Sequence, residues 1–228
     1  MEIIKGEREE LEKKVIALLK EKVELKLKKK KKVVLGIPGG SSVKGVFEKL
    51  RVANLSWEDI EIFMVDERFV PLTNENSNFG QAEKLFIGDL FRKGKIPEEN
   101  VHAFSFNSDK EESVKEYEEE FFDGREKFDV VILGLGEDGH VASLFPKSDV
   151  LSEYCGFIFI ENSPKKPKER ISASRKLLEK TDFAILLVFG EGKKKAYERF
   201  LDKEIKVDDC PAKMLENVEE LFVFSDLG

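Results

Sequence analysis

The fold is decided by one stretch, Phe128-Asp129-Val130-Val131-Ile132-Leu133-Gly134-Leu135-Gly136-Glu137-Asp138-Gly139-His140-Val141-Ala142-Ser143-Leu144-Phe145-Pro146. Its first part is an apolar run rich in β-branched residues, which predicts a buried strand of a parallel sheet. The run leads into a glycine-rich loop that holds two carboxylates and His140, one of only two histidines in the chain. Ligands of open α/β sheets bind just beyond the carboxyl ends of strands, so this loop is a candidate site for chemistry.

The rest of the chain alternates apolar runs with segments of helical periodicity. Further strands are expected at residues 32–37, 60–65, 157–160, 183–189 and 221–224. Helices are expected over 7–20, 110–122, 173–180 and 193–201, and a short helix near Met214. Two more are expected from their capping residues: one follows Ser41 or Ser42, and one runs from Ser77 or Asn78 through Leu85. This order predicts an α/β fold with a mainly parallel, Rossmann-like sheet flanked by helices. No linker or repeat interrupts it, so we expect residues 1–228 to form a single domain.

The composition excludes several classes of protein. The 228 residues are 41% hydrophobic, and no apolar run approaches the roughly 20 residues of a membrane span. Two cysteines form no disulfide framework and the N-terminus lacks a signal-peptide core, so we expect a cytoplasmic protein. The net charge of −7 argues against general nucleic-acid binding, and lysines 28–32 are expected to form a solvated approach to a strand. The 37% of charged residues, with Gln81 as the only glutamine, resembles the composition of hyperthermophile proteins.

A dinucleotide site is one alternative interpretation of the His140 loop. The three glycines within residues 134–139 fit G-x-G-x-x-G, and Glu161 follows at the distance of a ribose-binding acid. Glu137 and Asp138, however, place negative charge where a pyrophosphate would lie, and Pro146 leaves no room for a long helix. We therefore expect no nucleotide cofactor.

A metal site and a purely structural loop are the other two alternatives. One histidine with neighbouring carboxylates provides too few ligands for zinc, and His102 lies in an apolar context that favours packing. A lone histidine often satisfies loop backbone groups, but the position of His140 at a strand end beside Asp138 makes a chemical role about equally plausible.

A second loop, Gly36-Ile37-Pro38-Gly39-Gly40-Ser41-Ser42, has the composition of a phosphate cradle. Glycines let backbone N–H groups turn inward, and two hydroxyls precede a helix N-terminus. The loop is not a P-loop, because no lysine follows the second glycine as G-K-[ST] requires. A plain strand-to-helix turn is the competing interpretation.

Three further segments carry charges suited to an anionic ligand. Arg68, in Asp66-Glu67-Arg68-Phe69-Val70-Pro71, offers a planar fork for a phosphate or carboxylate, and Asp66 is suited to binding sugar hydroxyls or acting as a base. Arg170 and Lys193 follow other predicted strands. Each of these residues alone is equally explained as a solvated charge or a surface ion pair. The loops after parallel strands gather at one edge of a sheet, which favours a shared anion site.

Together these segments resemble the 6-phosphogluconolactonase family. The resemblance rests on Pro38-Gly39-Gly40-Ser41, on 66–71 with Ser77-Asn78, on 136–146, on Arg170-Ile171-Ser172 and on Gly190-Glu191-Gly192-Lys193. The 136–146 match is long and specific, and the matches cover most of the chain in order. Ile37-Pro38 departs from the small residue that the family usually has before its glycines.

The resemblance implies hydrolysis of 6-phosphoglucono-δ-lactone to 6-phosphogluconate in the oxidative pentose phosphate pathway. A lactone is an activated ester, so a water and a general base suffice, without metal or cofactor. The resemblance makes His140 the base, with Asp138 positioning it or modulating its pKa. It assigns the phosphate and the sugar to Gly39, Gly40, Ser41, Asp66, Arg68, Gly139, Arg170 and Lys193. The expected partner is this small lactone alone, bound by a monomer.

Two other functions stay open on the sequence. Glucosamine-6-phosphate deaminases share the Asp-Gly-His element but continue with Ile-Ala-Phe-Asn-Glu-Pro, whereas this chain reads Val141-Ala142-Ser143-Leu144-Phe145-Pro146. They also have Asp-Glu-Tyr in place of Asp66-Glu67-Arg68. A non-catalytic sugar-phosphate sensor would keep the cradle without turnover, and the presence of His140 argues against it.

Overall fold

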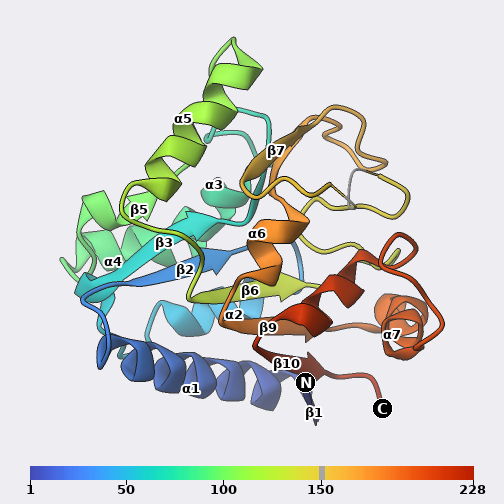
Figure 1. Cartoon of the computed structure of the whole chain (residues 1–228). Coiled ribbons are helices and arrows are strands. Elements are labelled where there is room, and N and C mark those ends of the chain that lie inside the picture. Colours follow the sequence, from blue (N-terminus) through green and yellow to red (C-terminus); the bar gives the residue numbers. More distant parts are fainter. Residues whose placement is uncertain (149–151) are drawn as a thin grey trace.

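The computed structural model describes residues 1–148 and 152–228, and its centre is a parallel sheet of seven strands (Figure 1). The strands are β1 (Glu2–Lys5), β2 (Val33–Ile37), β3 (Ile60–Met64), β5 (Val101–His102), β6 (Val130–Gly134), β9 (Phe183–Val188) and β10 (Glu220–Ser225). They lie in the order β1-β10-β9-β6-β2-β3-β5, and every pairing is parallel. The predicted α/β class with a mainly parallel sheet is confirmed.

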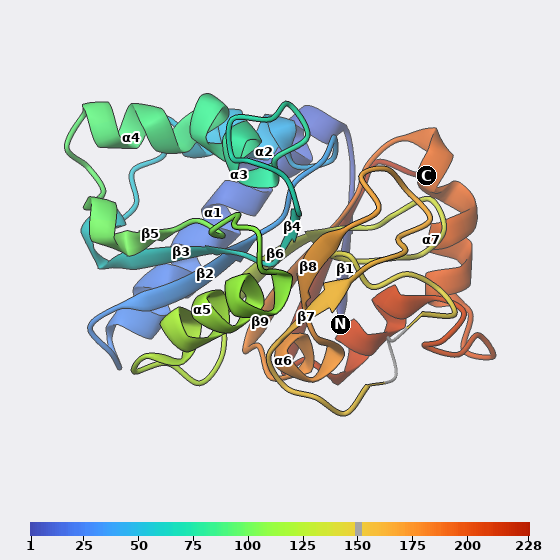
Figure 2. The same ribbon diagram turned by 90° about the horizontal axis from the view of Figure 1, so that it is seen from above.

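Helices cover both faces of the sheet (Figures 1 and 2). They are α1 (Arg8–Leu27), α2 (Lys44–Leu50), α3 (Asn78–Ala82), α4 (Gly88–Arg92), α5 (Lys110–Phe122), α6 (Arg175–Glu179) and α7 (Lys194–Leu201). A π-helical turn, Glu83–Ile87, joins α3 to α4, and short 3-10 helices lie at Trp57–Asp59, Glu98–Asn100, Glu191–Lys193 and Pro211–Asn217. None of the helices in the described ranges is both long and apolar enough to cross a membrane.

The sheet divides the hydrophobic core into two layers because successive strand residues face opposite sides. In β6, Val130 and Ile132 pack with α1, α2, α3 and α4, whereas Val131 and Leu133 pack with α5, α6 and α7. Such strands are buried on both faces, which is why they appear in the sequence as continuous apolar runs.

A second, antiparallel sheet was not predicted. It consists of β4 (Asp66–Arg68), β8 (Arg170–Ala173) and β7 (Phe157–Ile160), in the order β4-β8-β7, and lies above the carboxyl-terminal half of the main sheet (Figure 2). Residues 66–68, which no expected strand included, form β4, and the helix expected at 173–180 begins only at Arg175. The strand expected at 157–160 is present as β7, but it pairs antiparallel with β8 and does not belong to the parallel sheet. The three polar residues of β4 carry no apolar pattern, so only their pairing defines that strand.

Helix boundaries also differ from expectation at several points. The helix of 110–122 is confirmed, but α1 runs on to Leu27 and the helix behind Ser77 continues through α4. Ser77 does cap α3, since its side chain accepts a hydrogen bond from the Gly80 N–H. The cap expected from Ser41 or Ser42 is wrong, because α2 has Val43 at its N-cap and no side-chain cap bond.

Candidate active site

The candidate site is a pocket of about 290 Å³ at the carboxyl ends of the strands. Its lining comes from the segments after β2, β3, β6, β7 and β9, so the segments that the sequence singled out lie together. The strand order reverses between β2 and β6, which makes this edge a topological switch point. Open α/β sheets bind their ligands at such points.

The turn after β2 brings Gly39, Gly40 and Ser41 to the pocket. A Cβ on Gly39 would lie 1.8 Å from Oδ1 of Asn78, so only glycine allows the turn to pack this closely against α3. Gly40 has a φ of +94°, a conformation that side-chain-bearing residues rarely adopt. The backbone of this turn therefore lies directly on the pocket wall.

Strand β4 presents Asp66 and Arg68 to the pocket and buries Glu67 behind them, as the alternation of a strand requires. The Glu67 carboxylate accepts hydrogen bonds of 2.6–3.0 Å from the N–H groups of Arg68, Asn78 and Phe79 and from the Ser77 hydroxyl. Burial raises the pKa of Glu67, and these donors oppose that change. Glu67 thus fastens the start of α3 to β4.

The His140 loop is tightly folded by its own hydrogen bonds. The Gly136 N–H donates to the His140 carbonyl at 2.8 Å, and Ala142 is held at a φ of +50°. His140 lines the pocket, and its Nδ1 is hydrogen-bonded to Oδ1 of Asp138. Burial alone would raise the pKa of Asp138, but the hydrogen bond and charge of His140 outweigh it and hold that pKa well below its usual range.

An ionised Asp138 can only accept a hydrogen bond, so the Nδ1 of His140 carries the proton that it donates. In the neutral ring, Nε2 then has a free lone pair. A carboxylate that fixes the tautomer of a histidine in this way prepares the other nitrogen to act as a base. Asp138 itself does not line the pocket.

Arg170 lies on β8 and lines the pocket although only 4% of its surface is exposed. Its Nε donates to the Pro167 carbonyl at 3.0 Å, and its Nη2 lies 3.4 Å from the carbonyls of Lys165 and Lys166. Burial lowers the pKa of Arg170, yet a guanidinium stays charged. The buried cation would therefore be stabilised by an anionic ligand.

A buried serine connects three of these segments. The Ser143 hydroxyl, in the His140 loop, donates to Oδ2 of Asp66 at 2.7 Å, and Nη1 of Arg170 lies 3.5 Å from the Ser143 hydroxyl oxygen. The His140 loop, β4 and β8 are thus held in one arrangement by a set of polar contacts among largely buried side chains.

The pocket is strongly positive in a protein whose net charge is −7. Its basic lining residues are Arg68, Lys165, Lys166, Arg170 and Lys193, and Asp66 is the only acidic lining residue among those that the structure describes. Burial lowers the pKa of Lys193, which means that its charge too is poorly solvated. The excess of cations over carboxylates fits a ligand that carries more than one negative charge.

The sequence reasoning missed several lining residues and misplaced one. Lys165 and Lys166, which stand between two prolines, were not singled out from the sequence, and Asn78 and Ala142 also line the pocket. Gly139 does not line it: its φ is +91°, and a Cβ there would lie 2.8 Å from the sulfur of Cys210. Gly139 turns the loop and packs behind the pocket.

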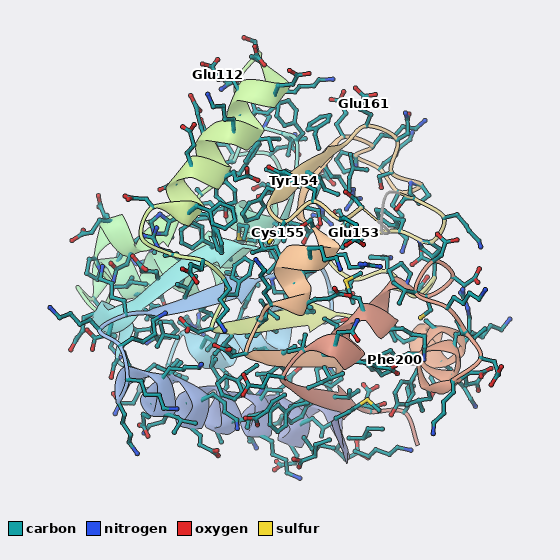
Figure 3. The ribbon with its side chains drawn as sticks, viewed as in Figure 1. Glu112, Glu153, Tyr154, Cys155, Glu161 and Phe200 are labelled. Atoms are coloured by element: carbon teal, nitrogen blue, oxygen red, sulfur yellow. The ribbon has the colours of Figure 1, made fainter. Side chains whose placement is uncertain are left out.

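The dinucleotide interpretation fails on the structure. No helix follows the glycines of 134–139 within the part of the loop up to Ser148 that the structure describes, so no helix N-terminus faces a pyrophosphate. Glu161 is exposed at the outer end of β7 (Figure 3) and does not line the pocket. In residues 1–148 and 152–228, no cluster of three or more His, Cys, Asp and Glu side chains is suited to hold a metal ion.

Fold and site together define a class, an α/β protein whose switch-point pocket is suited to a small anionic ligand beside a histidine–aspartate pair. Residues 6–223 match the family described as glucosamine-6-phosphate isomerases/6-phosphogluconolactonase. The chain is 36% identical over 201 residues to a 6-phosphogluconolactonase of Borreliella burgdorferi, with 87% of this chain and 86% of that protein covered. It therefore belongs to the family of glucosamine-6-phosphate isomerases and 6-phosphogluconolactonases.

Two further similarities concern Thermotoga maritima. A 6-phosphogluconolactonase from that organism is 32% identical over 180 residues, which cover 78% of this chain and 79% of that one. A crystal structure of a 6-phosphogluconolactonase from T. maritima superposes with a TM-score of 0.85 at 29% identity, and the match covers 98% of both chains.

Proposed function

We propose that this protein hydrolyses 6-phosphoglucono-δ-lactone to 6-phosphogluconate, a step of the oxidative pentose phosphate pathway. Its family membership supports this function, as do relatives named as lactonases. The single observation that carries the proposal is the ionised Asp138 on Nδ1 of His140, at the wall of a pocket with five basic side chains. This arrangement provides a base next to an anion site.

The reaction follows from these groups. Nε2 of His140 accepts a proton from water while the water oxygen bonds to the lactone carbonyl carbon. The bond between that carbon and the ring oxygen then breaks, and the imidazolium returns the proton to the ring oxygen. Asp138 keeps the ring oriented and stabilises the imidazolium, as the carboxylate of a catalytic triad does. The product is a carboxylic acid, which ionises at neutral pH.

The other lining residues bind the substrate in this proposal. Gly39 and Ser41 supply backbone and hydroxyl donors for the phosphate, Gly40 forms the turn between them, and Arg68, Arg170 and Lys193 supply charge. Asp66 accepts hydrogen bonds from sugar hydroxyls. To the sequence-based set we add Lys165 and Lys166, which line the same pocket. Gly139 is left out of the binding set because it packs on Cys210.

The deaminase or isomerase alternative is not favoured. Phe145 stands where the deaminase motif has its glutamate, and its ring lies 4.6 Å from that of His140. An apolar ring at this position provides no second acid–base group. Release of ammonia from glucosamine 6-phosphate would identify the deaminase, and tight binding of 6-phosphogluconate without turnover would identify a sensor.

The decisive experiment is background-corrected hydrolysis of freshly generated 6-phosphogluconolactone by wild type and His140→Asn. Removing a general base costs about 10²–10⁴ in rate, so the variant should lose most turnover but still bind 6-phosphogluconate. A folded, product-binding His140→Asn protein with wild-type turnover would disprove the mechanism.

His102→Asn is the matched control, at the only other histidine of the chain. His102 stacks on Phe63 at 3.9 Å and bonds to Glu120, and it does not line the pocket. Its replacement should change the rate only as far as it changes the folded fraction.

We also propose a single-domain monomer in the cytoplasm of a heat-adapted organism, with no nucleic-acid or membrane partner. The pairing of β1 with β10 supports one domain, because it joins the two ends of the chain in one sheet. The exposed large apolar side chains support a monomer, since Ile3, Leu25, Val52, Phe106 and Leu201 lie on separate segments. Light scattering tests the monomer, and fractionation of cells tests the compartment.

A further inference from the structure

Gln81 contacts the anion-binding turn without lining the candidate pocket. Its side-chain amide accepts a hydrogen bond from the Gly40 N–H at 2.9 Å and donates one to the Gly40 carbonyl at 3.0 Å. Both main-chain polar groups of one glycine are thus held by one side chain. Gln81 is the only glutamine in the chain.

We propose that Gln81 is a positioning residue, which sets the direction of the peptide groups that bind the substrate phosphate. The inference rests on the proposed function, because it assigns the Gly39–Ser41 turn to the phosphate. It adds a residue that acts through Gly40 and touches no substrate itself.

The geometry of the peptide group shows how Gln81 acts. In a trans peptide, the C=O of one residue and the N–H of the next point in opposite directions. Because the Gly40 carbonyl is bound to Gln81, the Ser41 N–H faces away from Gln81. Gln81 lines a second cavity, of about 950 Å³, whereas Gly40 and Ser41 line both cavities. The side opposite Gln81 is therefore the candidate pocket, and the Ser41 N–H is available to an anion there.

Helix α3 gives Gln81 a rigid base. Glu67 holds the first N–H groups of α3 from within the core, and the Asn78 side chain donates to the Asp66 carbonyl at 2.8 Å. Asn78, which lies three residues before Gln81 on the same helix, also packs against Gly39. One short helix therefore supports two successive glycines of the turn.

Gly40 needs such support because of its own conformation. Its φ is +94°, it has no side chain of its own, and no atom lies within 4 Å of the position that a Cβ would occupy. Apart from Gln81, little therefore restrains its backbone. A free glycine samples several backbone conformations. Rotation of the Gly40–Ser41 peptide would point a carbonyl oxygen at the phosphate instead of an N–H. Phosphate contacts are the same in substrate and transition state, so their loss should raise KM and leave kcat nearly unchanged.

The test compares wild type with two variants. Gln81→Met keeps the length of the side chain but removes both hydrogen bonds. Gln81→Glu keeps the acceptor for the Gly40 N–H but places a carboxylate oxygen, which repels, against the Gly40 carbonyl. Calorimetry measures Kd for inorganic phosphate and for 6-phosphogluconate. Kinetics give kcat and KM for the phosphorylated lactone and for unphosphorylated gluconolactone. Glu83→Gln, an exposed change two residues further along, is the control.

Both Gln81 variants should raise Kd for the two anions, and KM for the phosphorylated lactone, about tenfold, as loss of a charge-assisted contact does. Values of kcat/KM for unphosphorylated gluconolactone and the melting midpoint should stay near those of wild type. Unchanged anion affinity, or equal losses on both lactones, would overturn the proposal. If wild type binds the anions but hydrolyses neither lactone, the proposed function fails, while the Kd comparison still decides the role of Gln81.

Discussion

Gly136 lies directly against the imidazole of His140, which makes Gly136→Ala the sharpest perturbation of the proposed mechanism. A Cβ on Gly136 would lie 2.0 Å from Nδ1 and 2.2 Å from Cε1, whereas ordinary contacts begin at 3.4 Å. The ring cannot stay bonded to Asp138 and must move by roughly 1 Å or more, and such a misplacement of a catalytic group costs about 100-fold in rate. We expect kcat to fall by about that factor.

Binding should be spared, because the phosphate contacts come from other segments than the His140 loop. The assay is kcat from background-corrected lactone hydrolysis, together with calorimetric Kd for 6-phosphogluconate and a melting midpoint. Gly134→Ala is the matched control, since its Cβ would meet the nearest atom, Cβ of Ser42, at an ordinary 3.5 Å. If folded Gly136→Ala turns over at the wild-type rate, the position of His140 does not control the reaction and the reasoning fails.

Three further predictions concern the anion site and stability. Arg68→Ala should lower kcat/KM for the phosphorylated lactone about ten- to hundredfold and spare unphosphorylated gluconolactone; equal kinetic losses would contradict the anion site. Hydrogen bonds of 2.7 and 2.8 Å from Arg125 lower the pKa of Glu61, so the stability they add is present at neutral pH and lost as pH falls below 4.5. Glu61→Gln should cost about 2 kcal/mol in urea unfolding at pH 7 and weaken that acid dependence, and an unchanged pH profile would refute it. Calorimetry should place the melting midpoint above about 65 °C, and a lower midpoint would count against a heat-adapted source.

The central strands could be predicted because strands that are buried on both faces appear in the sequence as continuous apolar runs. β6 and β9 are such runs: β6 lies within the apolar run that predicted it, and β9 agrees with the predicted 183–189 to within a residue. β1 and β5 were missed for the opposite reason. β1 is an edge strand with mostly exposed residues, and β5 has only two residues, so neither leaves an apolar pattern.

The small antiparallel sheet lies beyond single-sequence reasoning. Asp66–Arg68 is a strand because it pairs with Arg170–Ser172, about a hundred residues later in the chain. Its polar residues make local pattern favour a loop. This pairing fixes where Arg68 and Arg170 lie, so the geometry of the anion site follows from long-range contacts.

The sequence by itself determined the α/β class, the single histidine–aspartate pair at a strand end and the composition of the loops that surround it. These properties depend on hydrophobic periodicity and on neighbours within a few residues, which are local. Only the tertiary structure decided which charges meet. It brought Lys165 and Lys166 into the pocket, turned Gly139 away from it and placed Gln81 behind Gly40. The physical reason is that such contacts join segments far apart in the chain, 41 residues for Gly40 and Gln81 and 71 for Gly139 and Cys210. Their approach is set by the packing of helices and strands on the sheet and leaves no trace in local pattern.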